Sequence, residues 1–224
     1  MNRTHRLTAV LLMILMAALC APAQDSTAKP AVKPKVEKAK PSKSKPTEAK
    51  GKDIVVIETS MGTIEAQLYP ADAPKTVENF EKLAGKKFFD GMRVHRIAKN
   101  FVIQAGDDKS KDPALVDSWG TGGQSIWGKE FEDELNPNTP SYKAGYTKGV
   151  LAMANRGPNT NTSQFFICLG DVGLPHSYTI FGKVTTGMDV VDKIGAVEII
   201  PSQMGPTDGR PKSDILIKSI SLKK

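Results

Sequence analysis

GVLAMANRGPNTNTSQFFI, residues Gly149–Ile167, is the stretch of this 224-residue chain that decides its fold. It holds one apolar run, Val150–Ala154, and leads into a second, Gln164–Leu169, and both have the length and composition of buried strands. Between them lie Gly, Pro and Asn residues, which favour turns. The stretch therefore predicts two strands joined by a polar loop, with the amide side chains of Asn155 and Gln164 at the ends of that loop.

Two other segments show the same mixture of polar donors and apolar residues. One is Val94–Asp107 (VHRIAKNFVIQAGD), and the other is Gly120–Gly128 (GTGGQSIWG), which is followed by Phe131–Glu134. The sequence has no glycine-rich phosphate loop, no paired zinc-ligand spacing and no serine nucleophile elbow. The three mixed segments are therefore the candidates for a functional site.

Short strands are predicted from Ile54 to the end of the chain. Ile54–Thr59 and Ile64–Tyr69 flank a glycine-containing turn and predict a hairpin. The other strand candidates are Arg93–Ile97, Phe101–Ala105, Val150–Ala154, Gln164–Leu169, Thr179–Val184 and Ile215–Leu222. The charged stretch Lys109–Trp119 is interpreted as a loop.

Two helices are predicted among these strands. Ala73–Gly85 has Pro74 near its start and a glycine at its end, which are ordinary helix boundaries. Its apolar residues share one helical face: Val77, Phe80, Leu83 and Ala84. Met188–Ile194 predicts the second helix. Many short strands with only two helices favour a mainly β fold, a closed antiparallel barrel or a sandwich, over a parallel α/β sheet.

The first 23 residues have the pattern of a secretory signal peptide. Arg3 and Arg6 precede the uninterrupted apolar run Leu11–Leu19, and the small residues Ala21–Ala23 follow it, so we expect cleavage after Ala23. The apolar run is shorter than the roughly 20 residues that span a bilayer. We therefore expect an exported protein, periplasmic or secreted.

Cys20 leaves a second form of export open. A cysteine just after the apolar run can carry the lipid of a membrane-tethered lipoprotein, although Leu19 stands where such signals prefer a small residue. Once the signal is removed, Cys168 is the only remaining thiol, so no internal disulfide can form. Cys168 lies in an apolar run, where we expect a buried small hydrophobe and no nucleophile.

Residues 24–52 are rich in Lys, Pro and Ala and predict a disordered linker, because they contain too few large apolar residues to form a core. They also carry most of the net charge of +7: residues 1–24 contribute +2, residues 25–52 contribute +6, and residues 53–224 contribute −1. The folded domain is therefore placed at residues 53–224. Since it is nearly neutral, we expect no nucleic-acid binding.

In the three mixed segments the chain resembles the cyclophilin family, and the resemblance runs in order from about Ile54 to Leu222. Gly149–Ile167 alone is similar to that family's signature over some eighteen positions. The resemblance implies a closed eight-stranded antiparallel barrel with a helix over each end. It also implies a shallow groove that binds Xaa-Pro segments, and no cofactor or metal.

The resemblance also implies the site. Arg96 matches the family's catalytic arginine, and Gln104 matches the position that helps to hold it. The apolar slot for the proline ring would be formed by Phe101, Val102, Phe166 and Leu174. Ala154, Asn155 and Arg156 match the stretch that grips the substrate backbone, and Gln164 and Gly122 line the adjoining subsite.

Arginine suits this reaction for a physical reason. Rotation about a peptide bond has a barrier of about 18–20 kcal/mol, because the amide nitrogen shares its lone pair with the carbonyl. In the twisted state the nitrogen regains that lone pair, so a fixed donor aimed at it stabilises the transition state more than either planar state. His95, next to Arg96, is expected to point to the opposite face of a regular strand and to be structural.

Two groove positions depart from the best-known family members. Gly173 takes the place of a tryptophan and Tyr178 that of a histidine. Tyrosine keeps an aromatic wall and a hydroxyl, so isomerase activity is expected to survive. Loss of the tryptophan removes a large contact to the cyclic peptide cyclosporin, so we expect weak cyclosporin binding.

The leading hypothesis is a monomeric peptidyl-prolyl cis-trans isomerase that speeds the folding of exported proteins by acting on proline-containing unfolded or loop segments. The alternative is a binding module or chaperone, in which the same groove holds proline segments with little turnover. Gly173 and Tyr178 are the sequence features that support the alternative. The two hypotheses differ in whether Arg96 is needed.

Overall fold

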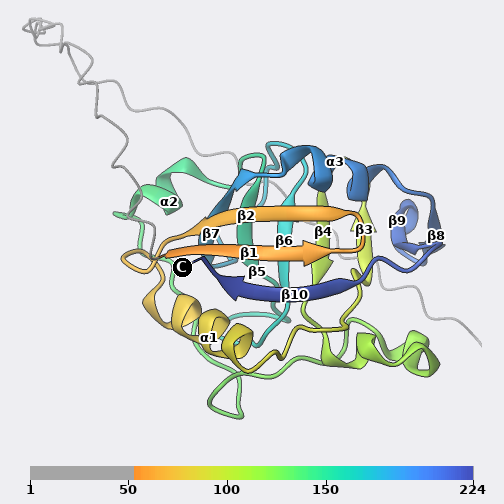
Figure 1. Ribbon diagram of the computed structural model, residues 1–224. Coiled ribbons are helices and arrows are strands. Elements are labelled where there is room, and N and C mark those ends of the chain that lie inside the picture. The colour runs from red at the N-terminus through yellow and green to blue at the C-terminus, as the bar shows by residue number, and fades with distance from the viewer. Residues whose placement is uncertain (1–52, 224) are drawn as a thin grey trace, which may run out of the picture. The chain divides into compact units, whose positions relative to one another are not determined.

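The computed structural model describes residues 53–223 (Figure 1). The predicted signal peptide (1–23), the linker (24–52) and the lipid site at Cys20 lie outside the described residues. The elements are β1 (Ile54–Thr59), β2 (Gly62–Leu68), α1 (Pro74–Gly85), β3 (Arg96–Ala98), β4 (Val102–Ala105), 3-10 helices at Asp108–Lys111 and Pro113–Ser118, α2 (Pro140–Ala144), β5 (Val150–Met153), β6 (Phe165–Cys168), β7 (Ile180–Thr186), α3 (Met188–Ala196), β8 (Ile199–Ser202), β9 (Gly205–Pro211) and β10 (Ile217–Leu222).

The ten strands form one antiparallel sheet in the order β10-β1-β2-β7-β5-β6-β4-β3-β9-β8. Each of the eight predicted strands has a counterpart, and β1 and β2 form the predicted hairpin. The prediction of a closed eight-stranded barrel is wrong, because the sheet has ten strands and its order ends at β10 and β8. The segment before β3 runs along the start of β10 without forming a regular strand. Arg93 forms an isolated bridge with Leu216, and the backbone N–H groups of Gly91 and Ile217 donate to the carbonyl oxygens of Ile217 and Met92.

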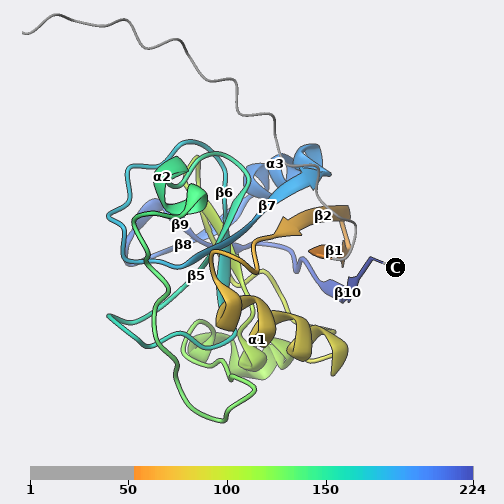
Figure 2. The ribbon, with the colours of Figure 1, turned by 90° about the vertical axis from the view of Figure 1, so that its left-hand side faces the viewer.

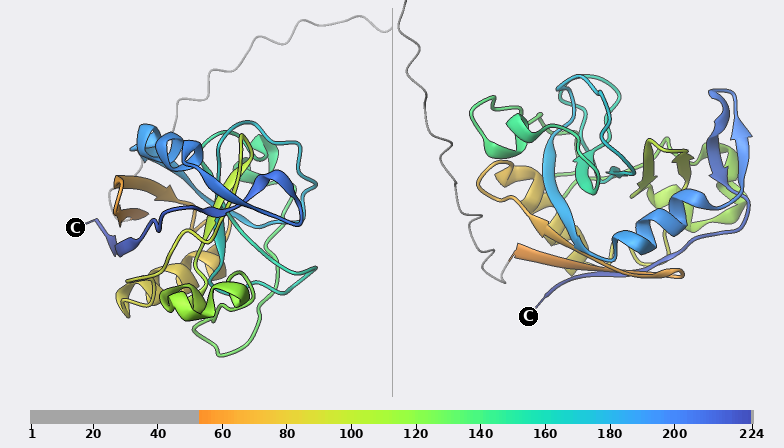
Figure 3. Two further views of the ribbon diagram at one scale, coloured as in Figure 1. Left: turned by 90° about the vertical axis from the view of Figure 1, so that its right-hand side faces the viewer. Right: turned by 90° about the horizontal axis from the view of Figure 1, so that it is seen from above.

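The two strands that the sequence did not predict, β8 and β9, form a hairpin that pairs with β3. Figure 3 (right) shows this hairpin at the end of the sheet away from α2. The close pairing of its strands needs glycine at position 209, because a Cβ there would overlap the Ile200 carbonyl oxygen. The hairpin adds a wall beside β3.

The sheet buries a different apolar cluster on each of its faces, as the two-residue repeat of a strand requires. The inner cluster takes Ile103, Leu151, Phe165 and Ile167 from β4, β5 and β6. The outer cluster takes the alternate residues of the same three strands: Val102, Val150, Ala152, Phe166 and Cys168. Cys168 is fully buried, as predicted, and burial raises its pKa to about 12, so its thiol stays protonated.

Helices α1 and α3 lie on opposite sides of the inner core (Figures 1 and 2). The predicted apolar face of α1 is buried there, together with Val190, Val191 and Ile194 of α3. Lys109–Trp119, predicted as a loop, forms two short 3-10 helices instead, because Asp107 and Asp112 accept hydrogen bonds from the backbone N–H groups at their starts. Within residues 53–223, no helix has the length and apolar character needed to cross a membrane.

Candidate functional site

One row of residues crosses four strands on the outer face of the sheet. Arg96 of β3 pairs with Gln104 of β4, Gln104 pairs with Phe166 of β6, and Phe166 pairs with Ala152 of β5. Paired residues in antiparallel strands place their side chains on the same face. Since a slip of one residue would turn every side chain of a strand to the other face, the buried inner cluster fixes this row.

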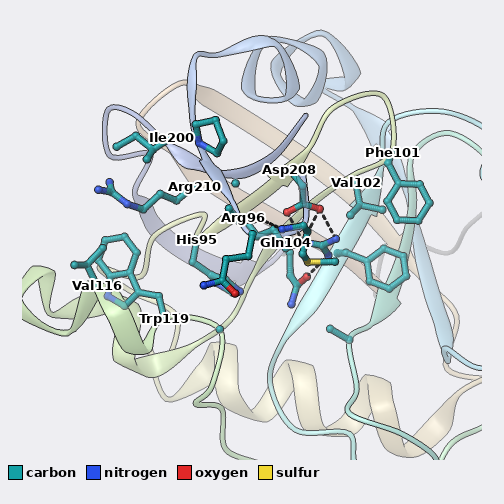
Figure 4. Close-up of a pocket in the computed structure, with 18 of the residues that line it drawn as sticks. His95, Arg96, Phe101, Val102, Gln104, Val116, Trp119, Ile200, Asp208 and Arg210 are labelled. Atoms are coloured by element: carbon teal, nitrogen blue, oxygen red, sulfur yellow. Dashed lines mark hydrogen bonds and ion pairs between the residues drawn. The ribbon is translucent and has the colours of Figure 1, made fainter. Parts of the chain in front are cut away.

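A cavity of about 750 Å³ lies over this row (Figure 4). Eight of the predicted site residues line it: Arg96, Phe101, Val102, Gln104, Ala154, Asn155, Phe166 and Leu174. Tyr178 lines it as well. The other three, Gly122, Arg156 and Gln164, line a smaller cavity of about 60 Å³ beside it. The structure therefore brings all the predicted site residues together, while their roles stay predictions.

The Arg96 guanidinium is held on two sides. Its Nε and Nη2 donate to the carboxylate of Asp208 on β9, with an Nη2–Oδ2 distance of 2.7 Å, and its Nη1 donates to Gln104 Oε1 at 3.0 Å. These bonds use three of the roughly five N–H groups of a guanidinium. Within residues 53–223, one N–H on Nη1 and one on Nη2 have no partner.

Hydrogen bonds from Gln104 connect Arg96 to the residues that line the smaller cavity. Gln104 Nε2 donates to Gln164 Oε1 at 2.9 Å, and Gln164 Nε2 donates to the carbonyl oxygens of Gly120 and Gly122 at 3.0 and 2.8 Å. Both amides are thereby fixed in one orientation, since each uses an oxygen as acceptor and a nitrogen as donor. The chain of bonds from Asp208 to Gly122 holds Arg96 in place.

The apolar slot lies next to Arg96. Phe166 and Val102 are almost fully buried in the outer cluster, and Phe101, Leu174 and Tyr178 pack against it while staying partly exposed. The Tyr178 ring meets the Phe166 ring edge-on, with centroids 5.7 Å apart. The slot is thus a rigid apolar wall that faces a charged donor.

The polar side of the groove comes from the loop after β5. Asn155 Nδ2 donates to the Ser177 carbonyl at 2.8 Å, which ties this loop to the one that carries Leu174 and Tyr178. Arg156 is largely exposed, and its Nη2 lies 2.7 Å from Glu130 Oε1 at the edge of the smaller cavity. Its charge is therefore already paired.

Gly173 lies outside the main cavity. It lines a separate hollow with Tyr146 and His176, whereas its neighbour Leu174 lines the main one. A Cβ at Gly173 would have no other heavy atom within 4 Å. The position is therefore open to a larger side chain.

His95 departs from the sequence prediction, because it lines the cavity instead of pointing to the opposite face. The reason is that β3 begins only at Arg96, so His95 is not in a regular strand. Both ring nitrogens are buried without a hydrogen-bond partner in the described part of the chain. Burial lowers the pKa of His95 to about 4; the Asp107 carboxylate opposes this shift and the Arg96 charge adds to it, so the imidazole is neutral at neutral pH.

Asp208 is the main site residue that sequence reasoning missed. It lies 112 residues from Arg96 in a stretch rich in Gly and Pro that gave no strand pattern. Val116, Trp119, Ile200 and Arg210 also line the cavity and were not predicted. In the part of the chain that the structure describes, no group of three or more His, Cys, Asp or Glu residues is arranged to hold a metal ion.

Comparison with known proteins agrees with this geometry. Residues 54–222 match the family model described as cyclophilin type peptidyl-prolyl cis-trans isomerase/CLD. Peptidyl-prolyl cis-trans isomerase-like 1 of Mus musculus is 46% identical over 155 residues, which cover 69% of this chain and 86% of that protein. Peptidylprolyl isomerase domain and WD repeat-containing protein 1 of Homo sapiens is 42% identical over 182 residues, which cover 79% of this chain and 26% of that protein.

Solved structures show the same likeness. A crystal structure of a Cryptosporidium parvum cyclophilin type peptidyl-prolyl cis-trans isomerase superposes with a TM-score of 0.67 at 31% identity, covering 77% of this chain and 98% of that one. The same protein was solved in the presence of the dipeptide Ala-Pro, and that structure superposes with a TM-score of 0.66.

Proposed function

The chain belongs to the cyclophilin family of peptidyl-prolyl cis-trans isomerases, and from this premise we propose that it acts on Xaa-Pro bonds in unfolded or loop segments of exported proteins. The observation that carries the proposal is the Arg96 guanidinium, fixed by Asp208 and Gln104 beside an apolar slot. The structure of a relative solved in the presence of Ala-Pro supports a proline-containing ligand.

The reaction needs a donor that favours the twisted bond. The two unpartnered N–H groups of Arg96 are donors available beside the apolar slot, and Asp208 and Gln104 hold them in place before the substrate arrives. A donor that is already oriented needs no reorganisation when the bond twists, and this is where most of the catalytic gain of such groups comes from. We assign this role to Arg96.

The slot holds the proline ring still while the other side of the bond turns. Its surface is apolar and comes from four side chains: Phe101, Val102, Phe166 and Leu174. This surface suits the proline ring, which has no N–H group to donate. Asn155 lines the cavity, where its amide can bond the substrate backbone, while Gln164 lines the smaller cavity and its amide is already bonded to Gln104, Gly120 and Gly122. Each such bond is worth about 0.5–1.5 kcal/mol.

The proposal that the protein is exported rests on its first 23 residues. Arg3, Arg6 and the apolar run Leu11–Leu19 support a signal peptide, and the Lys-rich linker supports a domain held on a tether. Mass analysis of the N-terminus of the full chain from fractionated cells tests this. We expect a mature protein that begins at Gln24 in the exported fraction. A lipid on Cys20 would show membrane tethering, and an intact Met1 in the cytoplasm would contradict export.

Activity toward exported proteins is tested separately. We expect the full chain to accelerate the slow, proline-limited refolding phase of an exported protein, with a rate that rises with enzyme concentration. An Arg96→Ala variant that rescues the same protein equally well would favour the holding chaperone instead.

A further inference from the structure

We propose that the cavity has a second substrate-binding lobe on the side of Arg96 away from the proline slot, and that it takes an apolar residue of the substrate with an acidic residue next to it. The lobe is lined by Val116 and Trp119 on one side and by Ile200 and Arg210 on the other. The proposal deepens the proposed function and rests on it.

The lobe is continuous with the site. Figure 4 shows Val116 and Trp119 below and Ile200 and Arg210 above, with Arg96 between this group and Phe101 and Val102. All these residues line the same cavity of about 750 Å³. A peptide whose proline occupies the slot therefore has an open path past Arg96 into the lobe.

The hairpin β8–β9 builds one wall of the lobe. Ile200 and Arg210 are cross-strand partners, so their side chains share one face of the hairpin. Asp208 precedes Arg210 by two residues and shares that face as well. Because Asp208 is fixed by its ion pair with Arg96, the same pairing sets where Arg210 and Ile200 stand.

The opposite wall is rigid. The indole N–H of Trp119 donates to the Asp112 carbonyl at 3.0 Å, and the Arg93 guanidinium carbon lies 5.5 Å from the centre of the indole ring. Trp119 thus offers its remaining surface in a fixed position. Aromatic side chains held in this way bind apolar groups at little entropic cost.

The lobe also carries a free positive charge. Of the arginines in residues 53–223, Arg93 pairs with Asp214, Arg96 with Asp208 and Arg156 with Glu130, while Arg210 has no ion pair with any described residue. Arg210 is half-buried at the cavity wall, where an unpaired charge attracts an anion.

The exposed apolar surface points the same way. Ile200 is 40% exposed and Met204, at the tip of the hairpin, is 73% exposed, and both line the cavity. Together with Trp119 across the cavity, they form an apolar surface suited to contact an apolar residue of a ligand. An apolar residue with an acidic neighbour satisfies both features of the lobe.

The chain's own proline-rich segment does not fit this charge. Residues 25–52 contain nine lysines against three acidic residues, so they would bring more positive charge to Arg96 and Arg210. The occupant is therefore a separate protein segment of acidic and apolar character.

Four peptides test the lobe with the full chain. Each has Ala-Pro at its centre and differs in the pair placed two and three residues from the proline: Leu-Glu, Leu-Lys, Ala-Glu or Ala-Ala. The set of four is made twice, once with the pair before the proline and once with it after. Isomerisation is measured by nuclear magnetic resonance exchange and affinity by calorimetry. We expect Leu-Glu, on one side of the proline, to exceed Ala-Ala by about tenfold in kcat/KM and in affinity.

Variants assign the preference to the lobe. Arg210→Glu should reverse the order of Leu-Glu and Leu-Lys, and Ile200→Ser should reduce the advantage of Leu-Glu over Ala-Glu to below about twofold. Lys212→Gln, which removes an exposed charge paired with Glu198 outside the cavity, should leave the order unchanged. Raising the salt concentration should weaken the Glu preference.

Equal values for the four peptides, a preference for Leu-Lys, or an order that Arg210→Glu does not change would overturn the proposal. Failure of the proposed isomerase function would give a different result from failure of the proposed lobe. If the wild-type chain isomerises none of the peptides, the catalytic role fails, while the affinities still show whether the lobe discriminates between them.

Discussion

The Arg96 guanidinium and the Asp208 carboxylate form a two-pronged ion pair between β3 and β9, with Nε–Oδ1 and Nη2–Oδ2 distances of 3.1 and 2.7 Å. The exposed fractions of the two side chains are 27% and 11%, so the pair is only partly screened by solvent. Asp208 thereby fixes the plane of the guanidinium, and the Nη1 atom on the other edge donates to Gln104. We infer that Asp208 is a positioning residue for Arg96.

Asp208→Asn tests this relation. The amide keeps the size of the side chain but loses the charge, so Arg96 should become less well oriented and kcat should fall about tenfold with little change in KM. A protease-free isomerisation assay on the full chain gives both values. Asp208→Glu should recover part of the loss.

Asp214→Asn is the matched control, because it removes the partner of Arg93 in another arginine–aspartate pair, which lies outside the cavity. On a short Ala-Pro peptide that does not reach the lobe, where Arg93 packs on Trp119, its kcat should equal that of the wild type. If Asp208→Asn and Asp214→Asn lose activity equally, the Asp208 pair only stabilises the fold.

Acid should destabilise the protein through His95. Its pKa is about 4 in the folded state against about 6.5 in an unfolded chain, so between these values the unfolded state binds the extra proton. The free energy of unfolding contributed by this group is fully present above pH 6.5 and falls as the pH drops toward 4, by about 3 kcal/mol. Urea unfolding at a series of pH values measures this loss.

His95→Asn should flatten the pH dependence over that range, because asparagine does not titrate. His176→Asn, which changes an exposed histidine stacked on Tyr142, should keep the wild-type slope. Equal slopes in the wild type and in His95→Asn would show that other groups account for the acid sensitivity.

Cyclosporin binding should depend on position 173. We expect the wild type to bind it weakly and Gly173→Trp to bind it at least about tenfold more tightly, because an indole placed beside Leu174, which lines the main cavity, adds a large amphipathic contact at the rim. The space at Gly173 is open, so the substitution should cause no steric conflict. A fluorescence titration measures the affinity, and Gly173→Ala serves as the control. Tight binding by the wild type would refute the expectation.

Local patterns in the sequence predicted the interior well. The apolar runs predicted the buried strands β4, β5 and β6, and the apolar face of α1 is buried as expected. The family resemblance, and no local pattern, predicted that Phe101, Val102 and Phe166 line one slot. The positions of Arg96 and Gln104 followed from the family resemblance, and their pairing follows from the register of β3 and β4. These features depend on neighbours close in sequence or on a shared motif.

The sequence did not predict what depends on distant contacts. The hairpin β8–β9 has few apolar residues and several Gly and Pro residues, so no periodicity marks it, and it is held by pairing with β3. Asp208 could be recognised only once that pairing was known. The position of His95 was missed because β3 begins only at Arg96, and the strand order was missed because it ends in the unpredicted hairpin β8–β9.

The central claim is that a fixed Arg96 donor, beyond proline binding alone, accelerates the isomerisation. The most direct test is kcat/KM of the full chain and of Arg96→Ala on an Ala-Pro peptide by magnetic resonance exchange, with peptide affinity measured on the same samples. We predict that Arg96→Ala loses at least about 100-fold in kcat/KM while peptide affinity falls less than about tenfold. A variant that keeps the wild-type rate, or loses rate only in proportion to affinity, would contradict the account.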